Sequence, residues 1–171
     1  MASSISVPQG SLLSAYAAKG AFTDCYAMPV EGSVDLAEFL YAFYTTPLFK
    51  AERWLLATAL GLKATDQDAR LLSKADVARY SAWRVESRSP LEVLMDAGQT
   101  RSWLSVQTMA QDPSSTALLF GSAVVPVRPG GKFGLAFHAL LGFHRLYSKL
   151  LLRSAARRVI RLRQAQAASK E

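Results

Sequence analysis

The chain has 171 residues, 50% of them hydrophobic and 19% charged, which suits one domain with a sizeable core and excludes a wholly disordered chain. The net charge of +7 lies at one end: residues 145–171 hold eight Lys or Arg and one acid, whereas residues 1–144 hold twelve of each sign. A neutral body with a basic end argues against a nucleic-acid groove across the fold and confines any electrostatic partner to the C-terminal segment.

Cysteine content and the N-terminal region favour a reducing compartment. The single cysteine, Cys25, can form no internal disulfide and has no CxxC companion, so neither a disulfide framework nor a zinc knuckle is encoded. No basic region precedes the apolar patch SLLSAYAA, which disfavours a signal peptide. The apolar segment 133–152 contains Arg145 and Lys149, each costing roughly 2.5–3.5 kcal/mol at a bilayer centre. We therefore expect a cytoplasmic protein that carries no cofactor.

Residues 22–44 predict a strand followed by a helix. The stretch FTDCYAMPV (22–30) combines aromatic and small apolar residues and leads into a turn, which favours a short strand. Asp35 and Glu38 have the spacing of a capping box, and apolar side chains then recur with helical periodicity. We expect a helix that begins after Asp35 and ends near Thr45.

A second helix follows at once. Thr46 is a suitable N-cap, Pro47 suits the first helical position, and the apolar pattern stops at Gly61. Residues 61–76 are polar and predict a surface connector with one helical turn at 69–73.

Residues 79–127 change from helical to alternating periodicity. Short turn sequences separate the segments RYSAWRVES, LEVLMDA, RSWLSVQTMA and TALLFGSAVVPV, which predict four successive antiparallel strands. A Pro-Gly-Gly turn then leads into one long helix at about residues 132–166.

This order of elements predicts an α+β helix-grip fold, in which a curved antiparallel sheet wraps a long C-terminal helix. We expect a single domain over residues 1–171, with its core at about 12–158 and a basic helical tail at 159–171 that frays. Such a layout leaves an apolar space between the sheet and the helix.

Several segments resemble a known family. GFHRLYSKLLLRSA (142–155), DCYAMPV (24–30), TTPLFKAERWLLA (45–57) and GLK (61–63) are similar, in the same order, to an uncharacterised bacterial family related to START-like and polyketide-cyclase-like (SRPBCC) domains. The resemblance covers roughly residues 12–158, and Phe-His-Arg-Leu is its most specific part. It implies a helix-grip fold and a small apolar ligand, and it carries over no catalytic residues.

A ligand pocket between the sheet and the final helix is the leading expectation. Apolar walls with a few polar groups make typical small-molecule sites. The expected lining residues are Trp83, Trp103, Ser105, Gln107, Met109, Phe137, Leu140 and His144. A well-filled core explains the same residues and remains the alternative.

Catalytic signatures are absent from the sequence. His138 and His144 are six residues apart on one helix and face different ways, so they cannot chelate one metal ion. No GxSxG elbow and no complete dinucleotide loop occur. A cyclase-like enzyme would need an ionisable group in the pocket, for which Glu92, Asp96 and His144 are the candidates. Cross-strand ion pairs explain the two acids without chemistry, so a binding protein is favoured over an enzyme.

The C-terminal helix carries a basic stripe. Arg145, Lys149, Arg153, Arg157 and Arg161 recur every four residues. The stripe is a solvated helix face, or it attaches weakly to an anionic membrane surface or an acidic protein partner. Nucleic acid would be attracted only without specificity. The oligomeric state is not encoded.

Overall fold

The computed structural model describes residues 2–125 and 135–169, except for the side chains of residues 60 and 135–141. Its elements, in chain order, are β1 (Ser3–Ser4), α1 (Ser14–Ala18), β2 (Phe22–Glu31), α2 (Leu36–Tyr44), α3 (Pro47–Leu60), α4 (Asp66–Ser73), β3 (Arg79–Tyr80), β4 (Trp83–Arg88), β5 (Glu92–Ala97), β6 (Thr100–Met109), β7 (Asp112–Val124) and α5 (Leu135–Ala168). The protein is therefore an α+β chain, as predicted.

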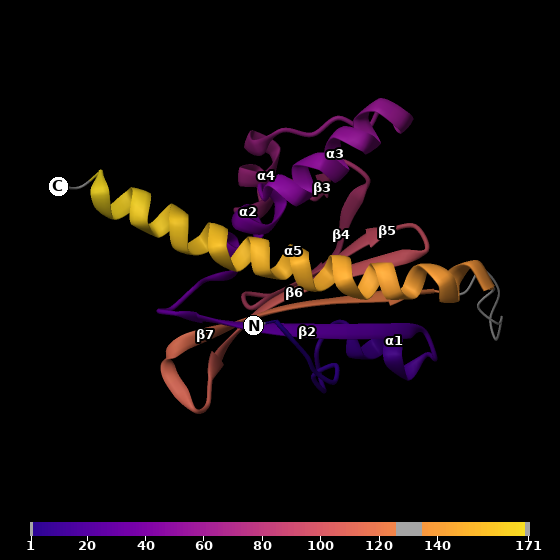
Figure 1. Cartoon of the computed structure of the whole chain (residues 1–171), viewed down its shortest axis with the longest axis horizontal. Helices are drawn as coiled ribbons and strands as arrows, with labels where there is room; N and C mark the ends of the chain where they lie inside the picture. Colours follow the sequence, from indigo (N-terminus) through magenta and orange to yellow (C-terminus); the bar gives the residue numbers. More distant parts are fainter. Residues whose placement is uncertain (1, 126–134, 170–171) are drawn as a thin grey trace.

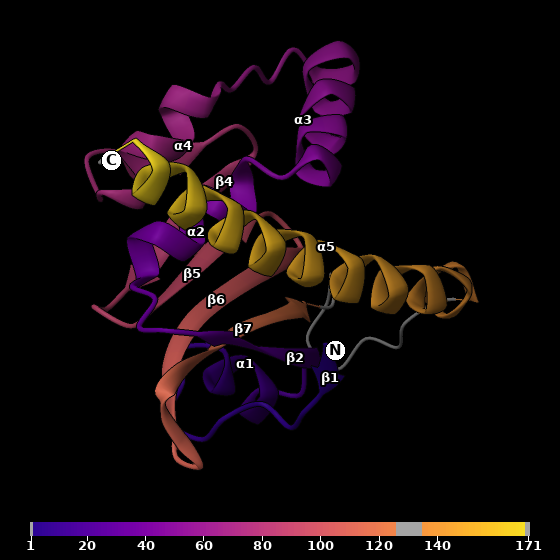
Figure 2. The ribbon, with the colours of Figure 1, turned by 60° about the vertical axis from the view of Figure 1, so that its left-hand side comes forward.

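The strands of the described residues form one sheet in the order β1-β2-β7-β6-β5-β4-β3. All neighbouring strands run antiparallel, and β4 to β7 form the predicted meander. The sheet curves around α5, and α2, α3 and α4 lie on the same side of it (Figures 1 and 2). The short helix α1 lies on the opposite side. Apolar side chains are therefore buried on both faces of the sheet, in two clusters.

Helices α2 and α3 begin and end where the local sequence predicts. The Asp35 carboxylate caps α2 by accepting a hydrogen bond of 2.7 Å from the backbone N–H of Glu38. Thr46 caps α3 in the same way, and Pro47 is its first residue. The reciprocal half of the predicted capping box is replaced, because the Glu38 carboxylate accepts two hydrogen bonds from Arg163 of α5.

The polar connector is more ordered than predicted. Helix α4 begins before the single expected turn at 69–73, because Thr65 and Asp68 form a capping box at its start. The first predicted strand of the meander is divided in two, since Ser81 has a φ of 53°, which a continuous strand does not allow.

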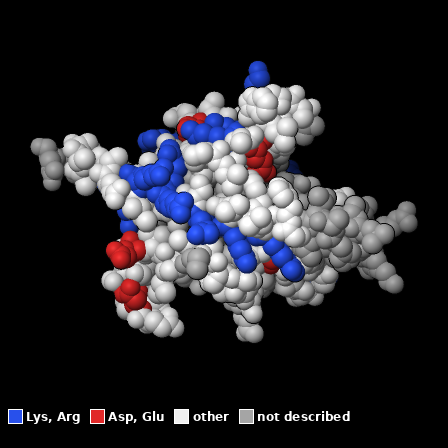
Figure 3. All heavy atoms as spheres, in the orientation of Figure 1, with Lys and Arg blue, Asp and Glu red and all other residues white. Residues whose placement is uncertain are grey.

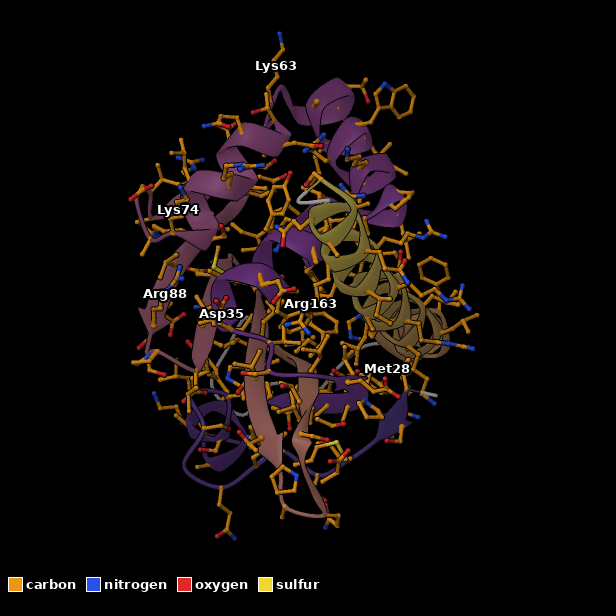
Figure 4. All side chains as sticks on the ribbon, turned by 90° about the vertical axis from the view of Figure 1, so that its left-hand side faces the viewer. Met28, Asp35, Lys63, Lys74, Arg88 and Arg163 are labelled. Carbon is orange, nitrogen blue, oxygen red and sulfur yellow. The ribbon has the colours of Figure 1, made fainter. Side chains whose placement is uncertain are left out.

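The middle of helix α5 packs against the helices and the sheet. Its buried residues include Leu151, Leu152, Ala155 and Val159, and it continues to Ala168. Residues 159–168 belong to this helix, and the expectation that the tail frays stays a prediction. Val159 is buried, and Arg163 donates from Nε to Glu38 at 2.6 Å, so this part of α5 lies beside α2; Figure 4 labels Arg163. No helix in the described part of the chain is long and apolar enough to cross a membrane.

Candidate functional site

A cavity of about 230 Å³ lies where α5 crosses the concave face of the sheet. Side chains of α2, α3, β4, β6, β7 and α5 surround it. The apolar lining includes Phe43, Phe49, Trp83, Phe120 and Leu151, and the polar lining includes Tyr44, Glu52, Ser102, Ser122, His144, Tyr147 and Ser148. An apolar cavity of about 150 Å³ holds benzene, so this space suits a molecule of one ring or a short branched chain.

Aromatic rings form the apolar wall of the cavity. The Phe43 ring lies 5.0 Å from the Phe120 ring and 5.8 Å from the Phe49 ring, measured between centroids. Trp83 continues the series at 5.1 Å from Phe49. Rings at these separations pack favourably and hold one another in place, so the wall is preorganised.

A polar cluster stands at the His144 end of the cavity. Asp24 of β2 and Ser122 of β7 are direct partners across the sheet, and the Ser122 hydroxyl donates to Asp24 Oδ1 at 2.6 Å. His144 Nε2 lies 2.9 Å from Ser122 Oγ and 3.2 Å from Asp24 Oδ2, and Tyr26 donates to the same carboxylate. In a catalytic triad, the acid and the serine contact different imidazole nitrogens. Here both contact Nε2, so the cluster holds His144 in position rather than activating Ser122.

The cluster predicts a pH dependence of stability. Burial alone would raise the pKa of Asp24, but hydrogen bonds from His144 and Ser122 outweigh it and hold this pKa below its usual value. A carboxyl group whose pKa is lower in the folded state stabilises the protein above its unfolded pKa, and this contribution is lost as the pH falls through the folded pKa.

Asp24→Asn is therefore expected to lower the free energy of unfolding by about 1–3 kcal/mol at neutral pH. The difference from wild type should shrink between about pH 5 and the lower pKa of the folded state. Urea denaturation of both proteins over this pH range measures the difference in free energy of unfolding. Asp76→Asn, which changes an exposed aspartate, is the control. A difference that does not change with pH would contradict the role assigned to the Asp24 carboxylate.

Two buried hydroxyls beside the cavity lack a hydrogen-bond partner in the described part of the chain. They belong to Tyr44 of α2 and Ser148 of α5. Nearby, the Tyr147 hydroxyl donates to the Glu52 carboxylate, and burial raises the pKa of Glu52 although this hydrogen bond opposes the shift. Tyr44 and Ser148 are both among the residues that line the cavity, and the Glu52 carboxylate in the same lining has a partner.

Only part of the expected lining reaches the cavity. Trp83 and His144 line it. The expected β6 residues are not among those that line this cavity: Trp103, Ser105, Gln107 and Met109. The side chains of Phe137 and Leu140, and that of His138, lie outside the described residues.

The alternation along β6 explains this difference. Leu104 and Val106 point toward α5 and belong to the larger core, so Trp103 must point away from it. Trp103 is fully buried in the second core with Leu13 and Cys25, under the N-terminal segment. Burial raises the pKa of the Cys25 thiol to about 12, so little of the reactive thiolate forms at neutral pH.

Two of the three acid–base candidates also lie away from the cavity. Glu92 accepts a hydrogen bond of 2.6 Å from Trp103 Nε1, on the α1 side of the sheet. Asp96 accepts a hydrogen bond of 2.8 Å from Arg101, its partner across the β5–β6 hairpin, and so forms a cross-strand ion pair. Of these candidates, His144 alone reaches the cavity.

Neither a search for metal ligands nor comparison with known proteins assigns a function to the cavity. Within residues 2–125 and 135–169, no group of three or more His, Cys, Asp or Glu is placed to hold a metal ion. The chain matches no family model, no curated protein and no solved structure. The family resemblance of residues 142–155 therefore remains a prediction.

Proposed function

We propose that this protein is a helix-grip domain of the START-like type that binds a small, neutral and mostly apolar molecule between α5 and the sheet. The observation that carries the proposal is the cavity of about 230 Å³, with aromatic walls and two unpartnered buried hydroxyls. A buried donor without a partner costs about 1–3 kcal/mol, and a ligand that accepts from it offsets this cost.

The chemistry of the lining narrows the class of ligand. Tyr44 and Ser148 offer O–H donors, so a ligand oxygen that accepts hydrogen bonds fits them. Glu52 lines the cavity and Asp24 lies next to it, whereas the guanidinium of Arg101, which is also in the lining, is already paired with Glu86 and Asp96. The two carboxylates would therefore repel an anionic ligand. A ketone, an ester, an ether or an alcohol of about one ring meets both requirements better than a carboxylic acid.

Tyr44→Phe tests this assignment with two probes, cyclohexanone and methylcyclohexane. We expect the substitution to weaken cyclohexanone binding about three- to tenfold, because it removes a hydrogen bond worth about 0.5–1.5 kcal/mol, and to leave hydrocarbon binding unchanged. Without ligand, it should raise the free energy of unfolding by about 1 kcal/mol, because it removes an unsatisfied hydroxyl. Ligand-observed NMR titration and urea denaturation measure the two effects.

Tyr41→Phe is the matched control, because Tyr41 also lies on α2 but is partly exposed and does not line the cavity. If neither probe binds wild-type protein, the cavity is not a site for small apolar molecules. If both probes bind and Tyr44→Phe changes neither affinity, the hydroxyl does not select the ligand.

A further inference from the structure

The outward side of α5 carries cations that the fold does not neutralise. Figure 3 shows Lys and Arg gathered in a band along this helix. Arg163 pairs with Glu38, but no described carboxylate forms a salt bridge with Arg153, Arg157 or Arg161. These like charges lie one helical turn apart, which destabilises an isolated helix.

The three arginines converge on one groove. Together with Arg158 and Pro47, they line a surface hollow of about 380 Å³ between α5 and the start of α3. Arg158 is held in place, because its Nε donates to Thr45 Oγ1 at 2.8 Å. Guanidinium groups bind phosphate oxygens through paired hydrogen bonds, so a groove with several of them suits a phosphate-bearing partner.

Large apolar side chains continue the same face of α5 toward its N-terminus. Phe143, Leu146 and Leu150 are 68%, 58% and 44% exposed. At 100° per residue, these three positions lie in the same sector of the helix as Arg153 and Arg157. One outward face is thus apolar in its first part and basic in its second. A free phosphate ion would contact only the basic part of this face. A bilayer surface offers lipid phosphates for the basic part and an apolar layer for the apolar part.

We propose that this outward face of α5 docks on an anionic lipid bilayer. Arg153, Arg157 and Arg161 bind lipid phosphates, while Phe143, Leu146 and Leu150 enter the headgroup region. The cavity is lined by another sector of α5, which holds His144, Ser148 and Leu151, so docking of the outward face does not depend on the cavity ligand.

Sedimentation of the full chain with vesicles tests the proposal. The vesicles are phosphatidylcholine alone or phosphatidylcholine with phosphatidylglycerol. We expect retention on the anionic vesicles and a loss of about a hundredfold in partitioning for the Arg153→Gln, Arg157→Gln, Arg161→Gln variant, at about fivefold per near-surface arginine. Leu146→Ser with Leu150→Ser should also lower retention, since it removes the apolar contribution.

The matched control removes the same charge elsewhere, by changing Lys19, Lys63 and Lys74, all exposed, to glutamine. Equal losses for the two triple variants would overturn the proposal, because net charge alone would then explain retention. It is also overturned if anionic vesicles fail to retain wild-type protein, or if glycerol phosphate displaces it at an equal phosphate concentration. Displacement by polyglutamate at an equal charge would overturn it too and would assign the face to an acidic protein.

Discussion

Leu152→Ala is expected to lower the free energy of unfolding by about 2–5 kcal/mol. Leu152 is fully buried on the side of α5 that packs into the larger core. Alanine would leave a void there, since the surrounding core relaxes only in part. Leu150→Ala, two residues away on the same helix, removes the same atoms from an exposed position and should change the free energy by no more than about 0.5 kcal/mol.

Urea denaturation of the two variants measures this contrast. The difference between them reports the packing of α5, because both variants change helix propensity in the same way. Equal and small effects would show that α5 does not cover the sheet, and the cavity between them would lose its physical basis.

Ser148→Leu is expected to reduce cyclohexanone affinity more than about tenfold. Ser148 is fully buried beside the cavity, so a leucine at this position occupies the space that the ligand needs. The substitution also replaces an unpartnered hydroxyl with apolar atoms in an unfilled space, so stability should not fall by more than about 1 kcal/mol. Ser154→Leu, on the same helix but in the outer groove, should bind cyclohexanone as wild type does.

Ligand-observed NMR and thermal denaturation follow binding and folding of these variants separately. A folded Ser148→Leu protein with unchanged affinity would place the ligand outside the cavity. If leucine proves too large for folding, Ser148→Val fills less of the space and should give a smaller loss of affinity in a folded protein.

Local signals were sufficient to predict the order and bounds of most elements. Asp35, Thr46 and Pro47 act within one helical turn of their own positions, so the starts of α2 and α3 could be read without tertiary knowledge. The strands β4 to β7 could also be predicted from local sequence, because each pairs with the strand that precedes or follows it in the chain.

The direction in which β6 side chains face could not be predicted in this way. Alternation assigns Trp103 and Leu104 to opposite faces but does not say which face meets α5. Both faces are buried, because the N-terminal segment around Leu13 covers the second one. Helix α1 has only five residues, which is too short for a periodic signal. The sequence therefore did not predict that the N-terminal segment covers this face of the sheet.

The polar groups at the site depend on contacts between distant segments. The partners of His144 are Asp24 and Ser122, which are 98 positions apart in the sequence and are brought together by the pairing of β2 with β7. Tyr44 belongs to a buried helix and reads as ordinary core, and its missing partner appears only in the folded structure. Ser148 offered one signal that could have been used, a polar residue on the buried side of α5.

A crystal structure determined under xenon pressure tests the central claim most directly, because xenon enters empty apolar cavities and shows their outline. We predict α5 packed across the concave face of the sheet, with xenon bound between Trp83, Phe120 and Ser148. A helix that stands away from the sheet, or side chains that fill this space and exclude xenon, would contradict the account.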